Sequence, residues 1–285
     1  MRNLIIRLLA GALCLLAGCL PAHAQGGVNM QSTVLITGSN RGIGLEFARQ
    51  YAQRGWRVIA TCRTPDRASE LQAIAEAHSN LVIEQLDIAD ASSVAALSGK
   101  LVDESIDVLL NNAALLGDPD LQKFPELDFE LFARIMNVNT LGTTQVSAAF
   151  LPQVARSEQK KIVILGSAAG SIGQVSAAPT SYLPYRASKA GLHLIAKNLG
   201  LHLAGQGIRV ALINPGVVDT RGGLDIGPDD PVPKEFRDIM PLVRQGIIEL
   251  QRPEDAVADM LERIDTMTDD DVARFLTADG QDLPW

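Results

Sequence analysis

Three side chains in the second half of the sequence have the types and spacing needed for proton transfer. Tyr185 and Lys189 are four residues apart, and Ser167 precedes the tyrosine by eighteen residues. On a helix, a spacing of four places a phenol and an ammonium one turn apart on the same face. An isolated tyrosine titrates near pH ~10, and a neighbouring cation lowers its pKa by favouring the phenolate. We therefore expect Tyr185 to exchange a proton with a carbonyl or alcohol oxygen that the Ser167 hydroxyl also holds.

A glycine-rich segment near the start of the chain indicates a phosphate-binding turn. It follows the apolar run 34–37 directly and opens a predicted helix. Its three glycines let the backbone turn tightly and approach a pyrophosphate, while the helix directs free N–H groups at the phosphates. Their spacing differs from the common G-x-G-x-x-G fingerprint. The residues expected to bind a dinucleotide here are Gly38, Asn40, Arg41, Gly42, Ile43 and Gly44.

The end of the second predicted strand favours NADP(H) over NAD(H). NAD sites usually carry Asp or Glu at this place, where the acid binds the ribose 2′-hydroxyl. Here Cys62 and Arg63 occupy it, and Asp66 comes only after Pro65. The guanidinium groups of Arg63 and Arg41 are suited to clamp a 2′-phosphate. We expect Asp66 to cap the next helix instead.

Short β-branched runs alternate with longer amphipathic segments from residue 33 onward. Strands that are apolar on both faces and separated by helices predict a parallel sheet covered on both sides. Right-handed crossovers make this a single-domain, doubly wound α/β fold of the Rossmann type, with helices on both faces. The predicted strands are 34–37, 57–61, 81–86, 107–110, 161–165, 208–213 and one near 275. The predicted helices are 42–54, 66–77, 90–102, 129–154, 185–204 and 253–264.

Two segments depart from this regular alternation. Residues 217–242 are rich in Pro, Gly and Asp and follow the sixth strand, and residues 171–181 are rich in small side chains. Long irregular segments inside a compact domain are usually functional. We expect both to form walls of a substrate pocket at the carboxyl edge of the sheet.

The first residues have the features of an export signal. Arg2 and Arg7 flank the start of the apolar run 8–20, which is too short for a comfortable membrane span but typical of a signal-peptide core. Cleavage after Ala24 and a lipobox that would make Cys19 a lipidated N-terminus are competing interpretations. A third is translation from Met30, which would leave the protein cytoplasmic.

These patterns predict an exported or membrane-anchored protein with a leader at 1–24, a linker at 25–32 and one domain at 33–285. Against export stands the expected cofactor, which is normally supplied in the cytoplasm. The leader or a lipidated Cys19 would be the protein's only association with a membrane.

Charge and metal-binding residue types exclude several other classes of partner. The formal net charge of −8, without a basic stripe, argues against a nucleic-acid partner. Cys62 is the only cysteine after the leader, so no intrachain disulfide is possible there. His78, His193 and His202 lack partners at metal-site spacing, and we interpret them as surface or helix residues.

Taken together, these motifs resemble the short-chain dehydrogenase/reductase family over residues 33–285. Within that family the chain looks closest to the C-factor and sniffer-type carbonyl reductases, because of the segments 39–46 and 185–189 and the ending 275–280 with Pro284-Trp285. The motifs that agree in order and spacing are the glycine loop, Leu86-Asp87-Ile88, Asn111-Asn112-Ala113-Ala114, Asn139, Ser167, Tyr185 with Lys189, and Asn214-Pro215-Gly216.

The resemblance implies roles for these residues. Tyr185 would give the proton to the carbonyl oxygen, Lys189 would lower the tyrosine pKa and bind the nicotinamide ribose, and Ser167 would hydrogen-bond the substrate oxygen. Asn139 would hold a water in a proton relay. The remaining implied contacts are Asp87 and Ile88 beside the adenine, Asn111 near the cofactor ribose, and Pro215 and Thr220 in the turn that reaches the carboxamide. The family also commonly forms dimers through long helices.

Three positions need separate interpretation. Ala114 replaces a usual glycine and adds a methyl group beside the expected cofactor. Gly166 replaces a serine often found before the catalytic one, which leaves Ser167 as the hydroxyl in place. Tyr182 also has a cation four residues later, but Pro184 suits a first helical turn. We therefore expect Tyr182 to precede the helix as a pocket wall or loop residue.

The sequence thus predicts an NADP(H)-dependent oxidoreductase that moves a hydride between nicotinamide and a small carbonyl or alcohol substrate. Two alternatives use the same fold. One is a nucleotide-binding signalling protein of the C-factor kind, without turnover, and the other is an epimerase or dehydratase. The intact set of Ser167, Tyr185 and Lys189 favours catalysis.

Overall fold

The computed structural model describes residues 31–174, 181–227, 230–234 and 236–285. The chain divides into two compact units, Met1–Met30 and Gln31–Trp285, and every described residue belongs to the second. The predicted leader, with Cys19 and Ala24, lies outside the described residues. No helix of the described part is long and apolar enough to cross a membrane.

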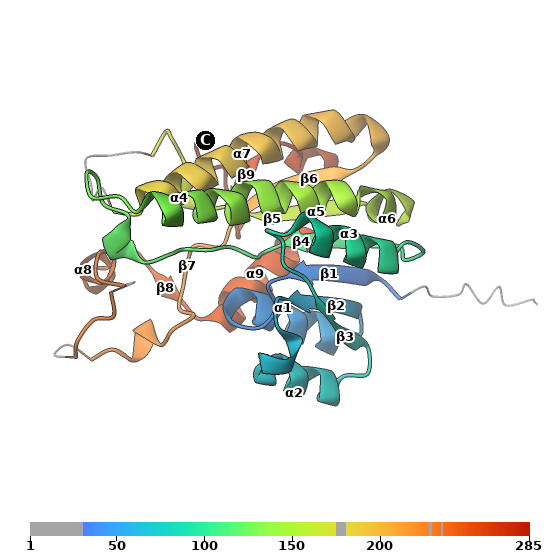
Figure 1. Ribbon diagram of the computed structural model, residues 1–285, viewed down its shortest axis with the longest axis horizontal. Helices are drawn as coiled ribbons and strands as arrows, with labels where there is room; N and C mark the ends of the chain where they lie inside the picture. The colour runs from blue at the N-terminus through green and yellow to red at the C-terminus, as the bar shows by residue number, and fades with distance from the viewer. Residues whose placement is uncertain (1–30, 175–180, 228–229, 235) are drawn as a thin grey trace, which may run out of the picture. The chain divides into compact units, whose positions relative to one another are not determined.

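A seven-stranded sheet forms the centre of this unit (Figure 1), and all its strand pairs are parallel. The strand order is β3-β2-β1-β4-β5-β6-β9, which confirms the predicted doubly wound α/β fold. Its strands are β1 (Thr33–Thr37), β2 (Arg57–Cys62), β3 (Leu81–Gln85), β4 (Val108–Asn111), β5 (Lys161–Leu165), β6 (Arg209–Asn214) and β9 (Phe275–Thr277). Two short strands, β7 (Val217–Val218) and β8 (Leu250–Gln251), pair with each other in a separate sheet.

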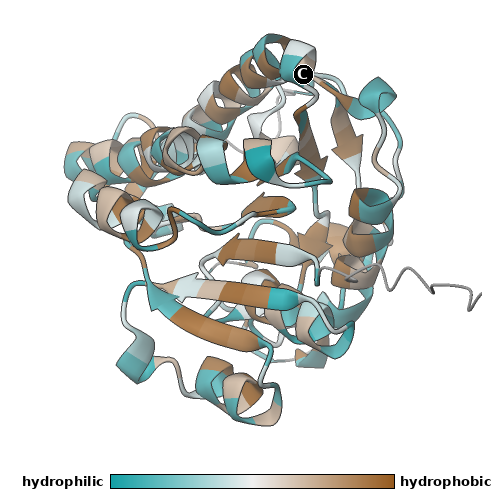
Figure 2. Cartoon of the chain, turned by 90° about the vertical axis from the view of Figure 1, so that its right-hand side faces the viewer, coloured by the Kyte–Doolittle hydropathy of each residue, from teal (hydrophilic) through white to brown (hydrophobic). Residues whose placement is uncertain are grey.

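Each central strand is buried on both faces because helices cover both. In β1, Val34 and Ile36 pack into one apolar core and Leu35 into the other, as the two-residue period of a strand requires. The first core contains side chains of α1 (Gly42–Gln53), α2 (Ser69–Ala77) and α9 (Pro253–Asp265). The second contains side chains of α3 (Ala91–Lys100), α5 (Thr143–Ala149) and α7 (Leu183–Leu203). Figure 2 shows the apolar strands between more hydrophilic helices.

The predicted helix 129–154 is not continuous. It forms α4 (Phe129–Met136), a π-helical turn η3 (Asn137–Gly142), α5 and α6 (Leu151–Arg156). Gly142 allows the turn to pack closely on the end of the third βα loop, because a Cβ there would lie 2.7 Å from the carbonyl oxygen of Ile88. Pro152 falls in the first turn of α6, where its missing N–H costs no helical hydrogen bond.

The predicted cap of the second helix is wrong. Asp66 lies in the short turn η1 (Pro65–Arg67), and α2 begins after it at Ser69. The residue at the cap position is Ala68, which makes no side-chain cap hydrogen bond. The proline directs the chain into a separate 3₁₀ turn, so the carboxylate lies too early to cap α2.

The order of the strands fixes where a ligand would bind. β1 and β4 are neighbours, but their connections lead to opposite faces of the sheet, which opens a crevice at their carboxyl ends. The glycine loop leaves β1 at this edge. The segment 217–242 lies at the same edge after β6 and contains β7, the short turn η6 (Gly223–Asp225) and the start of α8 (Met240–Arg244).

Candidate functional site

A cavity of about 650 Å³ occupies the crevice at the carboxyl edge of the sheet. Its lining comes from segments far apart in the sequence, which the parallel topology brings to the same edge. Among the residues predicted for the site, those that line it are Gly38, Asn40, Arg41, Gly42, Ile43, Gly44, Arg63, Asp87, Ile88, Ser167, Tyr185, Pro215 and Thr220. Asn111, Asn139 and Lys189 do not line the cavity but lie behind its wall, and each is at most 4 % exposed.

The glycine loop is packed so closely that side chains would not fit. A Cβ on Gly44 would lie 2.3 Å from the carbonyl oxygen of Gly38, and one on Gly38 would lie 2.9 Å from Cα of Ala113. The side-chain amide of Asn112 donates to the carbonyl oxygens of Thr37 (2.8 Å) and Gly38 (3.1 Å) and so ties the loop to the end of β4. The loop therefore presents the backbone at the start of α1 to the cavity.

The start of α1 is open toward a ligand. Arg41 occupies the cap position in an extended conformation and makes no side-chain cap hydrogen bond. The first N–H groups of a helix lack partners inside the helix and carry the positive end of its dipole. Gly42 is left-handed, with φ +57°, and faces Thr220 from the segment after β6. These features fit a pyrophosphate group between the two segments.

Near the end of β2 the cavity is lined by two arginines, and no acidic residue follows the strand directly. Arg41 and Arg63 both line it and are exposed, and neither side chain has a hydrogen bond or ion pair within the described chain. Cys62 lies beside them, buried and as a free thiol. Asp87 lines the cavity too, but its carboxylate accepts the N–H of Ala89 at 3.0 Å. This end of the cavity is suited to an anionic group.

Tyr185 and Ser167 meet on the cavity wall. α7 carries the tyrosine in its first turn, directly after Pro184, and the serine follows the end of β5. A hydrogen bond between the two side chains lowers the pKa of Tyr185, but burial has the larger effect and raises it above the ordinary value. Ser167 Oγ also accepts the N–H of Ala169 at 3.2 Å, which leaves the serine proton free to donate.

Lys189 lies one turn after Tyr185, beneath the cavity wall. Its Nζ is 5.9 Å from the centre of the tyrosine ring and donates to the carbonyl oxygen of Leu165 at 2.9 Å. Burial lowers the pKa of Lys189 to about 8. The expectation that the lysine lowers the tyrosine pKa is not borne out, because the pKa of Tyr185 responds to burial and to Ser167 and not to Lys189. Desolvation dominates both groups, and the lowering contribution to Tyr185 comes from Ser167.

Asn139 has its hydrogen-bonding groups engaged within the protein. Its amide donates to the carbonyl oxygen of Leu115 and to Ser188 Oγ, both at 2.9 Å, and its oxygen accepts the Leu115 N–H at 2.7 Å. Asn111 donates to Ser147 Oγ at 3.2 Å. Asn139 therefore fixes the backbone at Leu115, whereas Asn111 ties the end of β4 to α5 and keeps a buried oxygen without a hydrogen-bond partner in the described chain. The π-helical turn η3 brings Asn139 to this position.

Described residues of the two segments predicted from composition line another part of the cavity. Ser181 and Asp238 line it and join the segments by a hydrogen bond of 2.5 Å from Ser181 Oγ to Oδ2. Tyr182 precedes α7 in a left-handed conformation and packs edge-on to Tyr185, with ring centres 6.5 Å apart. It forms part of the wall, as expected. Residues 175–180 of the first segment lie outside the described residues.

Two buried side chains near the site were not predicted. Gln122 is fully buried, and its Oε1 accepts the backbone N–H of Tyr185 at 3.2 Å. His193 lies on helix α7, in agreement with its interpretation as a surface or helix residue, but its burial and contact were not predicted: it is 3 % exposed and accepts the backbone N–H of Ser167 at 3.3 Å. The spacing of eight from Tyr185 to His193, near two helical turns, was a usable signal for the histidine. Gln122 lies in a loop and had none.

The model of the family described as short chain dehydrogenase matches residues 32–230. An uncharacterised oxidoreductase of Schizosaccharomyces pombe is 30 % identical over 265 residues, which cover 92 % of this chain and 99 % of the relative.

Two solved structures are similar in fold and sequence. The NADPH-bound carbonyl reductase from chicken fatty liver has a TM-score of 0.74 and 27 % identity, covering 90 % of this chain and 99 % of its own. The 3-oxoacyl-[acyl-carrier protein] reductase from Brucella melitensis, in complex with NAD, has a TM-score of 0.73 and 25 % identity, covering 87 % and 95 %. With the dinucleotide crevice and the Ser167–Tyr185–Lys189 arrangement, these similarities lead to one conclusion: the chain belongs to the short-chain dehydrogenase family and is an oxidoreductase that binds a nicotinamide cofactor and acts on small molecules.

Proposed function

We propose that this protein is an NADP(H)-dependent carbonyl reductase or alcohol dehydrogenase. The observation that carries the proposal is the position of two hydroxyl groups, those of Ser167 and Tyr185, on the wall of the cavity that the glycine loop also lines. A substrate oxygen that reaches both hydroxyls would lie beside a dinucleotide seated on that loop. The cofactor would supply or accept the hydride at a carbon atom, which leaves proton transfer to the protein.

The protein's own groups support this division of work. The raised pKa of Tyr185 keeps the phenol protonated at neutral pH, as the donor in a reduction must be. Ser167 Oγ accepts from Ala169, and the hydroxyl that contacts Tyr185 in this structure would turn its proton to the substrate oxygen. Lys189 is a buried cation close to the tyrosine ring, so it would stabilise the phenolate left after proton transfer.

The test of the catalytic assignment is Tyr185→Phe. We expect kcat for NADPH-dependent carbonyl reduction to fall by about 10²-fold or more, the scale for loss of a positioned acid. Tyr51→Phe is a matched control, because the buried Tyr51 hydroxyl lies in the core and has no hydrogen-bond partner within the described chain. Near-wild-type turnover of Tyr185→Phe would remove this residue from the mechanism.

The two alternatives give different results with the wild-type protein. NADPH binding without oxidation across a broad panel of aldehydes and ketones would favour a signalling protein. Conversion of substrate without net consumption of NADPH would favour an epimerase or dehydratase, which recycles its nicotinamide.

The preference for NADP(H) is part of the proposal and rests on Arg41 and Arg63. We expect Arg63→Ala to weaken NADPH binding by about 10-fold or more while changing NADH binding little, because only NADPH carries the phosphate that the guanidinium would bind. Arg67→Ala is the control, since Arg67 lies in η1 and does not line the cavity. Titration of both nucleotides by fluorescence measures the effect, and equal losses for both would make Arg63 a structural residue.

Export and dimer formation also remain proposals. Mass spectrometry of the mature N-terminus distinguishes cleavage after Ala24, a diacylated Cys19 and a start at Met30. Light scattering of the purified protein measures whether it forms the expected homodimer.

A further inference from the structure

His193 is a buried, neutral imidazole directly behind the serine of the proposed active site. It lies on α7 one turn beyond Lys189, and its Nε2 accepts the backbone N–H of Ser167 at 3.3 Å. Burial, assisted by the positive charge of Lys189, lowers the pKa of His193 to about 4. The ring does not line the cavity, so it contacts neither substrate nor cofactor directly.

The hydrogen bond determines the tautomer of the ring. A nitrogen that accepts a hydrogen bond carries no proton, so the single proton of the neutral imidazole lies on Nδ1. Nδ1 is buried and has no hydrogen-bond partner within the described chain. A buried donor without a partner costs free energy, so a gain elsewhere is needed to offset it. The contact of Nε2 with Ser167 is the one polar interaction that this ring makes in the described structure.

The space around Nε2 explains why glycine precedes the serine. A Cβ on Gly166 would lie 3.1 Å from Nε2 of His193 and 3.0 Å from the ring of Phe275. A serine at 166, which is often found there in this family, would therefore require the imidazole, Phe275 or Leu212 to move by a few tenths of an ångström. Gly166 and His193 act as a pair, since the small residue makes room for the acceptor.

Aromatic contacts fix the imidazole from the other side. The ring centre of Phe275 is 4.4 Å from that of His193, and that of Trp285 is 6.5 Å away, at 77° to the imidazole. Lys197 Nζ lies 4.4 Å above the Trp285 ring. Phe275 belongs to β9, which joins the imidazole to the edge strand of the sheet.

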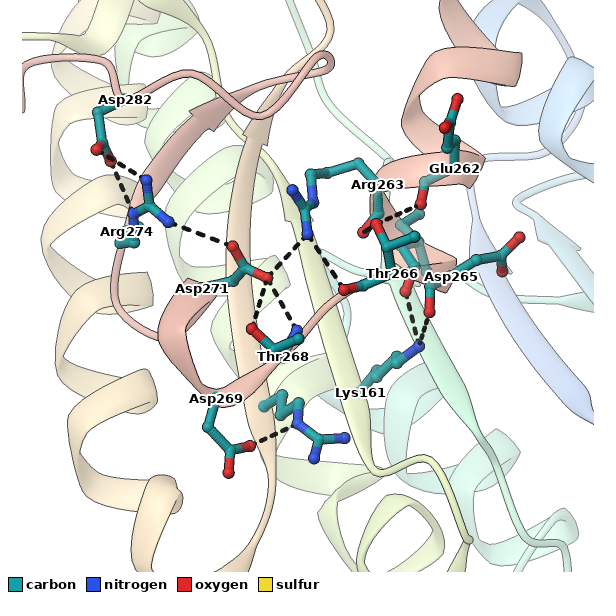
Figure 3. Close-up of polar contacts among 12 residues, drawn as sticks. Lys161, Glu262, Arg263, Asp265, Thr266, Thr268, Asp269, Asp271, Arg274 and Asp282 are labelled. Atoms are coloured by element: carbon teal, nitrogen blue, oxygen red, sulfur yellow. Dashed lines mark hydrogen bonds and ion pairs between the residues drawn. The ribbon is translucent and has the colours of Figure 1, made fainter.

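The segment that ends in Trp285 is itself tied to the fold at both ends. Arg274 forms a two-point ion pair with Asp282, both contacts at 2.8 Å, and also contacts Asp271 (Figure 3). At its far end, the carbonyl oxygen of Trp285 accepts the Gly173 N–H at 2.7 Å, and that of Pro284 accepts the Ser171 hydroxyl at 2.5 Å. The same tail therefore braces the imidazole and the start of the segment 171–181.

We propose that His193 is a positioning residue that fixes the carbonyl-binding Ser167 through its backbone amide, held in place by Phe275 and Trp285. The proposal rests on the proposed reductase function. His193 holds the main chain of Ser167 and the N–H of Ala169 holds its Oγ, so the hydroxyl is fixed on the cavity wall beside Tyr185. Without the acceptor at Nε2, the backbone at 166–167 shifts and the serine no longer shares the substrate oxygen with Tyr185.

Two variants separate positioning from packing. His193→Phe keeps a ring of similar size but removes the acceptor, whereas His193→Gln places an amide oxygen near the position of Nε2. We expect His193→Phe to lower kcat for carbonyl reduction by about 10-fold, because small displacements of reacting groups have effects of this order. NADPH affinity should stay within two-fold. His193→Gln should recover most of kcat, and the control His202→Phe, an exposed position on the same helix, should match wild type.

Three outcomes would overturn the proposal. Wild-type kcat in His193→Phe is one, and equal losses of kcat in the Phe and Gln variants, in step with their Tm, is another. The third needs no variant: ¹⁵N–¹H correlation spectra of the wild-type imidazole at pH 7 should show the proton on Nδ1, and a proton on Nε2 would contradict the hydrogen bond. A failure of the reductase function itself would appear as absence of turnover in the wild type, which these spectra do not depend on.

Discussion

The two ends of β5 offer a comparison between a structural and a functional use of the same side chain. Lys161 begins the strand, and Lys189 from α7 donates to the carbonyl oxygen of Leu165, which ends it. Each lysine is 4 % exposed, and burial lowers the pKa of both. Burial alone therefore does not distinguish the two sites.

Their partners do distinguish them. Lys161 Nζ caps the end of α9 by donating to the carbonyl oxygens of Ile264 (2.7 Å) and Asp265 (3.3 Å), as Figure 3 shows. The carboxylates of Asp265 and Asp107 partly offset the effect of burial on its pKa. Lys189 has one backbone carbonyl as its partner in the described chain, and no carboxylate offsets the lowering of its pKa. The ammonium of Lys161, at the end of β5 away from the cavity, is thus stabilised by carbonyl and carboxylate groups of the protein. The ammonium of Lys189, at the cavity end, has no carboxylate partner in the described chain, and we expect it to interact with a ligand and with the tyrosine phenolate.

The largest expected effect is at the cavity end. Lys189→Met should lower kcat/KM for carbonyl reduction by about 10²-fold or more, because the phenolate left on Tyr185 loses its neighbouring cation. The Tm should change little, since the lost hydrogen bond to Leu165 is offset by removal of a buried charge that no carboxylate compensates. Steady-state kinetics and thermal unfolding measure both quantities. A variant that keeps wild-type turnover would make Lys189 equivalent to Lys161.

The matched substitution at the end of β5 away from the cavity, Lys161→Met, should lower stability and leave turnover nearly unchanged. Lys161→Met leaves two carbonyl groups at the end of α9 without their donor, which costs about 1–3 kcal/mol. In a domain of this size we expect the Tm to fall by several degrees. Turnover should stay within about two-fold of wild type, because nothing at this edge faces the cavity. A large loss of kcat with an unchanged Tm would break the contrast.

The smallest expected effect is a pH dependence that only the cavity lysine should produce. As pH rises through about 8, Lys189 loses its proton, so reduction should slow by at most about tenfold per unit. Stability should change in the opposite sense. Between pH 8 and 10.5 the unfolded chain binds more protons at this residue than the folded one, so its contribution to the free energy of unfolding rises with pH.

Measurements on Lys189→Met provide the control for both pH effects. Between pH 8 and 10.5 the unfolding free energy of the wild type should rise relative to that of this variant. The variant's residual rate should lack the decline above pH 8. A parallel pH dependence in both proteins would assign the titration to another group.

The sequence predicted the parts of the molecule that local patterns determine. The β-branched runs located the central strands to within a residue or two, and Pro184 correctly placed Tyr182 before α7. The glycine loop and the Tyr185 helix could be recognised because spacing along one element determines which side chains share a face.

What could not be predicted depends on contacts between distant segments. The π-helical turn at 137–142 packs Gly142 against Ile88, and His193 lies against Phe275 and Trp285, so both depend on segments far apart in the sequence. Apart from its spacing of eight from Tyr185, nothing in the sequence around His193 distinguishes it from the exposed His202 on the same helix. The direction of the Tyr185 pKa was also beyond reach, because it depends on how much of the cavity wall covers the phenol.

The direction of β1 has a practical consequence for work on this protein. Thr33 begins the strand at the edge opposite to the one where the glycine loop emerges. Gln31, the first described residue, is exposed and therefore lies on the side of the domain away from the nucleotide crevice. A domain coupled to a sensor surface through a cysteine introduced at position 31 should keep this crevice open to titrated nucleotide.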